Sequence, residues 1–162
     1  MVKVCSGVGV IATLLQKAVN SGFIDLGFAE WIPQKGLQIK NLETLNKEAP
    51  GVYIMHHEGK IQKIGKSSAS LLRRLTGYKR FDSDSLAHPV TGTDKSSQSQ
   101  RKAIAKWGLP GLTVLVLQAE LGLTEFKELG ITTRTASFDS HELEKKLLEL
   151  AKQEGHPLDF GS

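Results

Sequence analysis

The chain has 162 residues, of which 40% are apolar and 23% charged, and its formal net charge is +4. This composition fits one soluble globular domain and excludes a largely disordered chain, and no apolar run approaches the roughly 20 residues of a membrane helix. The N-terminus lacks the pattern of a signal peptide, and the one cysteine, Cys5, excludes an internal disulfide, so we expect a cytoplasmic protein.

The N-terminal region predicts one helix followed by irregular chain. Residues 8–20 carry apolar side chains at helical spacing, and Gly22 fits the end of that helix. Residues 23–39 show no clear period, and Trp31 among them either anchors the core or stacks on a nucleic-acid base. Asn41 is expected to cap a short helix before the chain enters the first strand.

Residues 51–75 predict a strand, a turn, a second strand and a helix. Residues 52–55 are a β-rich run, the Glu-Gly pair at 58 and 59 supplies a turn, and residues 60–64 alternate between polar and apolar. Gly65 then ends the strand, and the serines at 67, 68 and 70 offer caps for a helix whose first apolar residues are Leu71, Leu72 and Leu75.

At these residues the chain resembles the GIY-YIG nuclease family. Gly51-Val52-Tyr53 stands in place of the first triplet, Lys63-Ile64-Gly65 in place of the second, and Arg74 in place of the family's helical arginine. Lys63 replaces the first tyrosine of the second triplet, which is similar to the branch that contains type II restriction endonucleases and phage DNA-degrading endonucleases. The resemblance covers about residues 49–80 tightly and 111–158 loosely.

The resemblance implies an α+β fold with a small, mostly antiparallel three-stranded sheet flanked by helices. To this core the chain adds an N-terminal helical extension and an inserted helix. We therefore expect a single domain over residues 1–162. It consists of an extension at 1–48 and a nuclease-like core at 49–162, with an insertion at about 81–110.

The register of the predicted hairpin decides whether Tyr53 and Lys63 share a face. A two-residue loop at 58–59 sends them to opposite faces, whereas a three-residue loop at 58–60 puts them on one face. We expect the three-residue loop, because the implied chemistry needs both side chains together.

The insertion and its surroundings carry most of the positive charge. Residues 78–93 are polar and indicate a surface loop, and residues 95–106 predict a helix that either grips DNA or closes a surface gap. Residues 55–106 carry a net charge of +7, whereas the rest of the chain carries −3. Such a concentration suits a polyanion, although a solvated basic surface accounts for it equally well.

The C-terminal third predicts a strand, a short helical piece and a long helix. Residues 112–117 form a near-continuous apolar run, typical of a strand covered on both faces in the middle of a sheet. Residues 121–134 hold a short helix-like piece and a turn at Gly130. Asp139 or Ser140 caps a helix from about His141 to Gln153.

Helical phase separates the acidic residues of this last helix. Glu144 falls inside the apolar arc, whereas Glu142 and Glu149 fall on the solvent side. Because desolvating an unpaired carboxylate is unfavourable, Glu144 needs a partner, either a bound cation or an arginine. The resemblance favours the cation, since Glu144-Lys-Lys-Leu147-Leu148 reproduces the pattern of the family's metal-binding glutamate.

The resemblance also implies the roles of the other site residues. Glu144 would hold Mg²⁺ (or Mn²⁺), Tyr53 would act as general base, and Arg74 would contact the scissile phosphate. The family's closing asparagine is absent, and Asp159 is the candidate for its place.

Two lysines complete the expected site. A Lys63 ammonium would favour the phenolate of Tyr53, because a nearby positive charge stabilises the ionised phenol. Lys66 would bind phosphate or water at the start of the helix, where backbone N–H groups favour anions. Six further bases are expected to contact DNA: Arg73, Lys79, Arg80, Lys95, Arg101 and Lys102.

The sequence thus predicts a metal-dependent endonuclease that cleaves double-stranded DNA in the manner of a restriction enzyme. A homodimer is expected, with the N-terminal helix and the Trp31 region as its interface, because cutting two strands with one site needs two copies or two visits. A non-catalytic nucleic-acid-binding module, a nicking nuclease and a structural interaction protein remain as alternatives.

Overall fold

The structure is a computed structural model that describes residues 12–32, 36–80 and 112–158. The predicted helix at 95–106, with Lys95, Arg101 and Lys102, lies outside the described residues, as does Asp159. In chain order the elements are α1 (Leu14–Asn20), β1 (Ile24–Ile32), β2 (Gly36–Gln38), η2 (Leu42–Thr44), β3 (Gly51–His57), β4 (Lys60–Ser67), α2 (Leu71–Thr76), η3 (Gly77–Arg80), β5 (Leu112–Gln118), β6 (Leu121–Phe126), η4 (Lys127–Leu129), β7 (Ile131–Ala136) and α5 (Ser140–Glu154).

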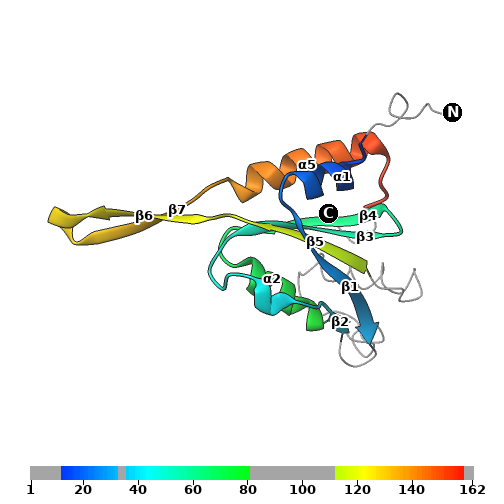
Figure 1. Cartoon of the computed structure of the whole chain (residues 1–162), viewed down its shortest axis with the longest axis horizontal. Coiled ribbons are helices and arrows are strands. Elements are labelled where there is room, and N and C mark those ends of the chain that lie inside the picture. Colours follow the sequence, from blue (N-terminus) through cyan, green and yellow to red (C-terminus); the bar gives the residue numbers. More distant parts are fainter. Residues whose placement is uncertain (1–11, 33–35, 81–111, 159–162) are drawn as a thin grey trace, which may run out of the picture.

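A five-stranded antiparallel sheet forms the centre of the molecule, in the order β2-β1-β5-β3-β4. Helices α1 and α5 cover one face and α2 covers the other (Figure 1). The predicted class, an antiparallel sheet flanked by helices, is confirmed, and β5 is the middle strand as its apolar run indicated. The predicted number of strands, three, is wrong.

The two extra strands come from the region expected to be irregular. Strand β1 is interrupted at Leu26, where the register to β5 shifts, and Gly27 follows with φ of +94°. Because such a bulge places two residues opposite one, it breaks the alternation by which a strand is recognised in sequence. The N-terminal region therefore adds two strands to the main sheet as well as a helix. Asn41 occupies the predicted N-cap position of η2, but its side chain makes no capping hydrogen bond; its amide donates to the Leu26 carbonyl instead.

Strand β3 contributes to both hydrophobic cores because both of its faces are covered. Tyr53 and Met55 pack into the core beneath α2 and η3, whereas Val52 and Ile54 pack into the core beneath α1 and α5. This double burial explains why residues 52–55 read as a continuous apolar run.

The β3–β4 hairpin reaches the expected register by an unexpected route. Glu58 and Gly59 form a two-residue turn with positive φ at both residues, as a type I′ turn requires, so the predicted three-residue loop is wrong. Strand β4 then bulges at Gln62, and from there Lys63 lies opposite Met55 and Gly65 opposite Tyr53. Tyr53 and Lys63 consequently share one face.

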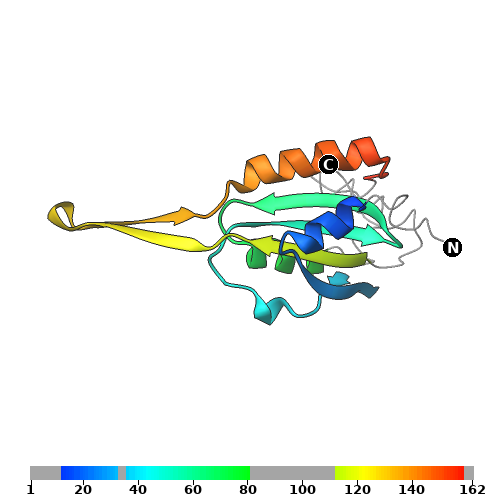
Figure 2. The same cartoon turned by 45° about the horizontal axis from the view of Figure 1, so that its top comes forward.

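A second hairpin, β6–β7, projects from the body as an arm (Figures 1 and 2). Its strands pair only with each other, and η4 and Gly130 at its tip match the predicted helical piece and turn. The strands on either side were not predicted, because most of their residues are exposed and no burial alternation marks them. Within the part of the chain that is described, no helix combines the length and apolar character needed to cross a bilayer.

We expect Gly65→Ala to destabilise the fold by about 1–3 kcal/mol, the usual effect of overpacking a core. A methyl group on Gly65 would overlap the Tyr53 ring, which is itself fully buried. Chemical denaturation monitored by circular dichroism measures the change.

Gly77→Ala is the matched control for this substitution. Gly77 has a helical backbone and no atom within 4 Å of the added methyl group, so the free energy of unfolding should stay the same or rise slightly. Equal losses in the two variants would contradict the proposed contact between Gly65 and Tyr53.

Candidate active site

Tyr53 lies at the centre of the candidate site. Strand β3 presents it on the face covered by α2, where its ring lies against the Gly65 backbone of β4. Its hydroxyl shares a 2.6 Å hydrogen bond with the hydroxyl of Tyr78, and the two rings meet edge to face with centroids 5.9 Å apart. The central phenol is therefore held on two sides before any substrate binds.

Helix α2 and the following turn η3 bring Arg74 and Tyr78 to Tyr53. Ser70 caps α2, because its hydroxyl accepts a hydrogen bond from the Arg73 amide. Arg74 is an exposed residue, and its side chain forms a hydrogen bond with Tyr53. Tyr78 was expected in a surface loop, yet its spacing of four residues from Arg74, which places two side chains on one helical face, was the available signal.

Lys63 enters the site from β4, two residues before Gly65. It is 7% exposed, which is unusual for a lysine, and lies within the electrostatic reach of Arg74 and Glu144. Burial lowers the pKa of its ammonium group, the Arg74 charge lowers this pKa further, and the Glu144 charge opposes both. At a given pH, a larger share of Lys63 is therefore neutral amine than of an exposed lysine.

Glu144 comes from α5 and completes the cluster. It is half-buried, whereas Glu142 and Glu149 are exposed, as the helical phase predicted. Its negative charge acts on both Tyr53 and Lys63. The predicted residues Tyr53, Lys63, Arg74 and Glu144 come from four separate elements and lie within electrostatic reach of Tyr53 or Lys63.

Helix α5 is capped at its start and tied to α1 and β4 near its end. The Asp139 carboxylate accepts hydrogen bonds from the amides of His141 and Glu142, so Asp139 is the cap. At the other end, Glu154 accepts from the Leu14 amide of α1, and the His156 ring accepts from the Ile61 amide of β4. These contacts hold the helix that carries Glu144 beside β4.

Burial dominates the ionisation of Tyr53. It raises the pKa of the phenol above its ordinary value near 10, and this effect outweighs the lowering by the Tyr78 hydrogen bond and by the Arg74 charge and hydrogen bond. The positive charge that lowers this pKa belongs to Arg74, whereas the sequence predicted that Lys63 would supply it. In the free protein Tyr53 is therefore a neutral phenol at neutral pH.

The remaining predicted residues lie around this cluster. Lys66 pairs with Val52, whose side chain faces α5, so the strand alternation places Lys66 on the sheet face away from Tyr53. Arg73 is exposed on α2 and lines an open hollow of about 270 Å³ together with Arg74 and Ser67. The backbone of η3 places Lys79 and Arg80 directly after Tyr78.

Glu144 fits a cation that is held by few protein ligands. Within the described residues, His, Cys, Asp and Glu form no group of three or more that could hold a metal ion. Magnesium keeps several of its waters and usually binds through one or two carboxylates together with substrate phosphates. A half-buried carboxylate within electrostatic reach of Lys63 is compatible with that coordination.

Comparison with known proteins adds little to this geometry. No protein-family model matches the sequence, and no curated protein sequence matches it. Among solved structures the chain is similar to the restriction endonuclease HPY188I in complex with product DNA. The identity is 17%, the alignment covers 97% of this chain and 96% of that one, and the TM-score is 0.42. These values do not by themselves establish a shared fold or activity.

The raised pKa of Tyr53 predicts how stability responds to alkali. A phenol whose pKa is higher in the folded than in the unfolded chain stabilises the fold fully below about pH 10, and this stabilisation is lost as the pH rises towards the folded value. Above pH 10 the free energy of unfolding of Tyr53→Phe should therefore decrease less steeply with rising pH than that of the wild type.

Absorbance at the phenolate band checks the same pKa directly. The chain has two tyrosines, so the signal that disappears in Tyr53→Phe belongs to Tyr53 or to its effect on Tyr78. That difference should titrate above pH 10. A difference that titrates near neutral pH would show that burial does not govern the ionisation of Tyr53.

Proposed function

We propose that the protein is a DNA endonuclease of the GIY-YIG type that hydrolyses phosphodiester bonds with Mg²⁺ or Mn²⁺. The observation that carries this proposal is the meeting of Tyr53, Lys63, Arg74 and Glu144. Phosphodiester hydrolysis needs a proton acceptor for water, positive charge for the phosphate oxygens and stabilisation of the leaving oxygen. The cluster offers groups suited to each need.

Arg74 is the residue placed to meet the scissile phosphate. Arg74 is an exposed residue whose side chain interacts with Tyr53, so a phosphate bound to it would lie near the phenol. A planar guanidinium can donate two hydrogen bonds to a phosphate and offset its charge.

Tyr53 accepts the proton of the attacking water in this proposal. Its own proton must leave first, and Lys63 is suited to receive it, because its lowered pKa increases the share of neutral amine. The resulting Lys63 ammonium, together with Arg74 and the Tyr78 hydrogen bond, favours the phenolate. Lys66, on the other sheet face, stays a predicted phosphate contact.

Glu144 is the residue that would hold the metal ion. A bound Mg²⁺ would supply a Lewis acid that offsets charge on the phosphate and on the leaving oxygen. The half-buried Glu144 lies within electrostatic reach of Lys63.

A non-catalytic DNA-binding module is the second candidate, because the basic residues serve it equally well. Incubation with supercoiled plasmid and Mg²⁺, with and without a chelator, separates the two. Cleavage that the chelator abolishes supports the nuclease, and binding without any cleavage supports the module.

Glu144→Gln should lower metal-dependent cleavage by roughly a hundredfold or more while DNA binding persists, because the amide keeps the shape and removes the charge. Glu142→Gln is the matched control, since this residue lies two positions away, about half a turn around the same helix, and is exposed. Cleavage rates and DNA affinity are measured on both variants. The reverse ranking would assign the metal to another carboxylate.

We further propose that the enzyme is a homodimer, so that two copies of the site cut the two strands of the duplex. The β6–β7 arm is the described surface best suited to the contact, because Leu123 and Leu129 are 68% and 70% exposed and Phe126 and Ile131 are also exposed. The arm carries two acids and two bases, so its charge does not attract DNA.

The body of the same chain also carries exposed apolar side chains that an arm could contact. Val19 of α1 and Ile24 and Phe28 of β1 are exposed there. A two-fold arrangement would let the arm of each copy cover the body of the other. The N-terminal helix thus stays part of the proposed interface, and the arm is added to it.

The double substitution Leu123→Ser and Leu129→Ser should produce a monomer, because it removes the most exposed apolar side chains of the arm. Light scattering on DNA-free protein measures the mass, and the plasmid time course should change from direct linear product to accumulated open circles. Glu125→Gln, in the same arm, should leave both unchanged. A wild type that is already monomeric would refute the dimer.

A further inference from the structure

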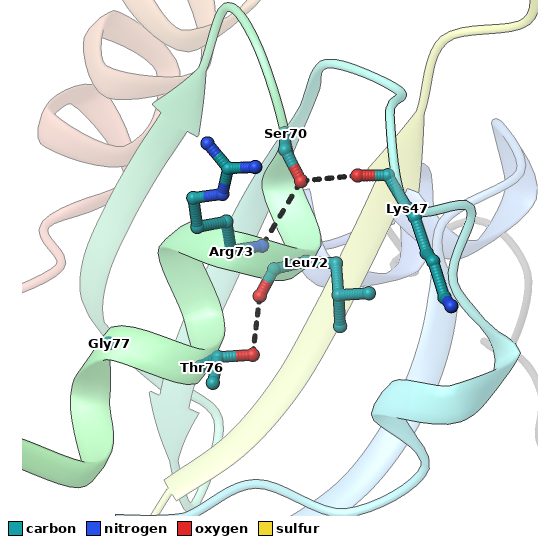
Figure 3. Close-up of a pocket in the computed structure, with 6 residues that line it drawn as sticks. All are labelled: Lys47, Ser70, Leu72, Arg73, Thr76 and Gly77. Atoms are coloured by element: carbon teal, nitrogen blue, oxygen red, sulfur yellow. Dashed lines mark hydrogen bonds between the residues drawn. The ribbon is translucent and has the colours of Figure 1, made fainter.

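A second hollow lies on the outer side of α2, beyond the one that contains Arg74. It has a volume of about 420 Å³ and is lined by Lys47, Ser70, Leu72, Arg73, Thr76 and Gly77 (Figure 3). Ser70 and Arg73 line both hollows. The two depressions therefore adjoin each other, with Arg73 between them.

The chain segment that carries Lys47 is held rigidly against α2 and β5. The Asn46 amide and carbonyl are both bonded to the Gln118 side chain, at 2.9 Å each. The Lys47 carbonyl accepts a hydrogen bond from the Ser70 hydroxyl at 2.6 Å, and the Ala49 carbonyl accepts one from the Leu71 amide at 3.0 Å. The backbone position of Lys47 relative to Arg73 is consequently fixed before a ligand binds.

The lining of this hollow suits an anion with an apolar neighbour. Lys47 and Arg73 come from the two sides of the hollow, and no acidic residue lines it. Within the described residues neither cation forms an ion pair, because the adjacent Glu48 pairs with Arg134 of the arm instead. Leu72 is half-buried and supplies an apolar surface between the two positive charges.

We propose that this hollow binds a second phosphate of the cleaved DNA strand, next to the scissile one, through Lys47 and Arg73. The assignment rests on the proposed nuclease function, since it takes the scissile phosphate to lie at Arg74. A strand that leaves Arg74 along α2 passes Arg73 and reaches Lys47, while the deoxyribose between the two phosphates lies over Leu72. Lys47 lies outside the region of family resemblance and is a new DNA-binding residue.

Lys47→Ala tests this site by the salt dependence of DNA binding. Fluorescence anisotropy with a labelled duplex, without metal so that the DNA stays intact, gives log K against log salt concentration. Loss of one phosphate contact should lower the magnitude of the slope by about 0.9. The substitution keeps the carbonyl that Ser70 bonds, so the fold is retained, and Lys47→Gln repeats the test with a longer side chain.

Lys152→Ala is the matched control, because this exposed lysine lies in the last turn of α5, outside the lining of either hollow. Its slope should equal that of the wild type. If Lys47→Ala and Lys47→Gln also keep the wild-type slope, the proposed phosphate site is wrong. If Lys152→Ala lowers the slope equally, the effect is only the net charge of the protein and the site is again wrong.

Replacing single DNA phosphates by neutral methylphosphonates identifies the phosphate that Lys47 contacts. Cleavage positions are first mapped, and single methylphosphonates are then introduced around the cut. The group beside the scissile phosphate should weaken wild-type binding and leave Lys47→Ala binding unchanged, since the contact is already lost. Independent effects of the two changes at every position would overturn the assignment. A wild type that neither cuts nor binds DNA would instead refute the proposed function itself.

Discussion

The close approach of the Tyr53 ring to the Gly65 backbone is the contact on which the candidate site depends. Only a residue without a side chain leaves room for the ring on the neighbouring strand. The bulge at Gln62 brings Gly65 opposite Tyr53 and turns Lys63 to the same face. A one-residue change in register would send Lys63 to the other core and leave the ring against a larger side chain. The same hairpin geometry therefore both packs the Tyr53 ring and places Lys63 on the face of the candidate site.

The burial that positions Tyr53 also opposes its ionisation. A buried phenol is expected to be neutral, and the groups around Tyr53 partly counter this effect through the Arg74 charge and the Tyr78 hydrogen bond. Lys63 experiences the opposite change, because burial favours its neutral amine. Desolvation thus favours the uncharged form of both side chains, the phenol of Tyr53 and the amine of Lys63. A bound phosphate and metal ion would shift these protonation equilibria.

The chain separates its charged and apolar surfaces. The bases near the site line the two hollows along α2, whereas the exposed apolar side chains lie on the β6–β7 arm and on α1 and β1. A two-stranded hairpin is at best marginally stable alone in water, so an arm of this kind benefits from a partner surface. The ion pair between Arg134 and Glu48 links the arm to the segment that carries Lys47.

The local sequence determined the elements whose signals are local. The hairpin and helix of residues 51–76, the central strand at 112–118 and the phase of Glu144 on α5 all follow from side-chain period, glycines and caps within a few residues. The candidate residues Tyr53, Lys63 and Arg74 came from the family resemblance, and Glu144 came from that resemblance together with its helical phase.

Tertiary structure decided the features that depend on contacts between distant segments. The bulges at Leu26 and Gln62 arise from pairing with another strand, so neither strand β1 nor the true hairpin turn could be predicted from period alone. Tyr78 and Lys47 are each positioned by a hydrogen bond to a distant residue. Tyr78 bonds Tyr53, which is 25 residues away, and the Lys47 carbonyl bonds Ser70, which is 23 residues away. The raised pKa of Tyr53 likewise requires burial by several elements at once, and burial is a property of the packed fold that no short stretch of sequence contains.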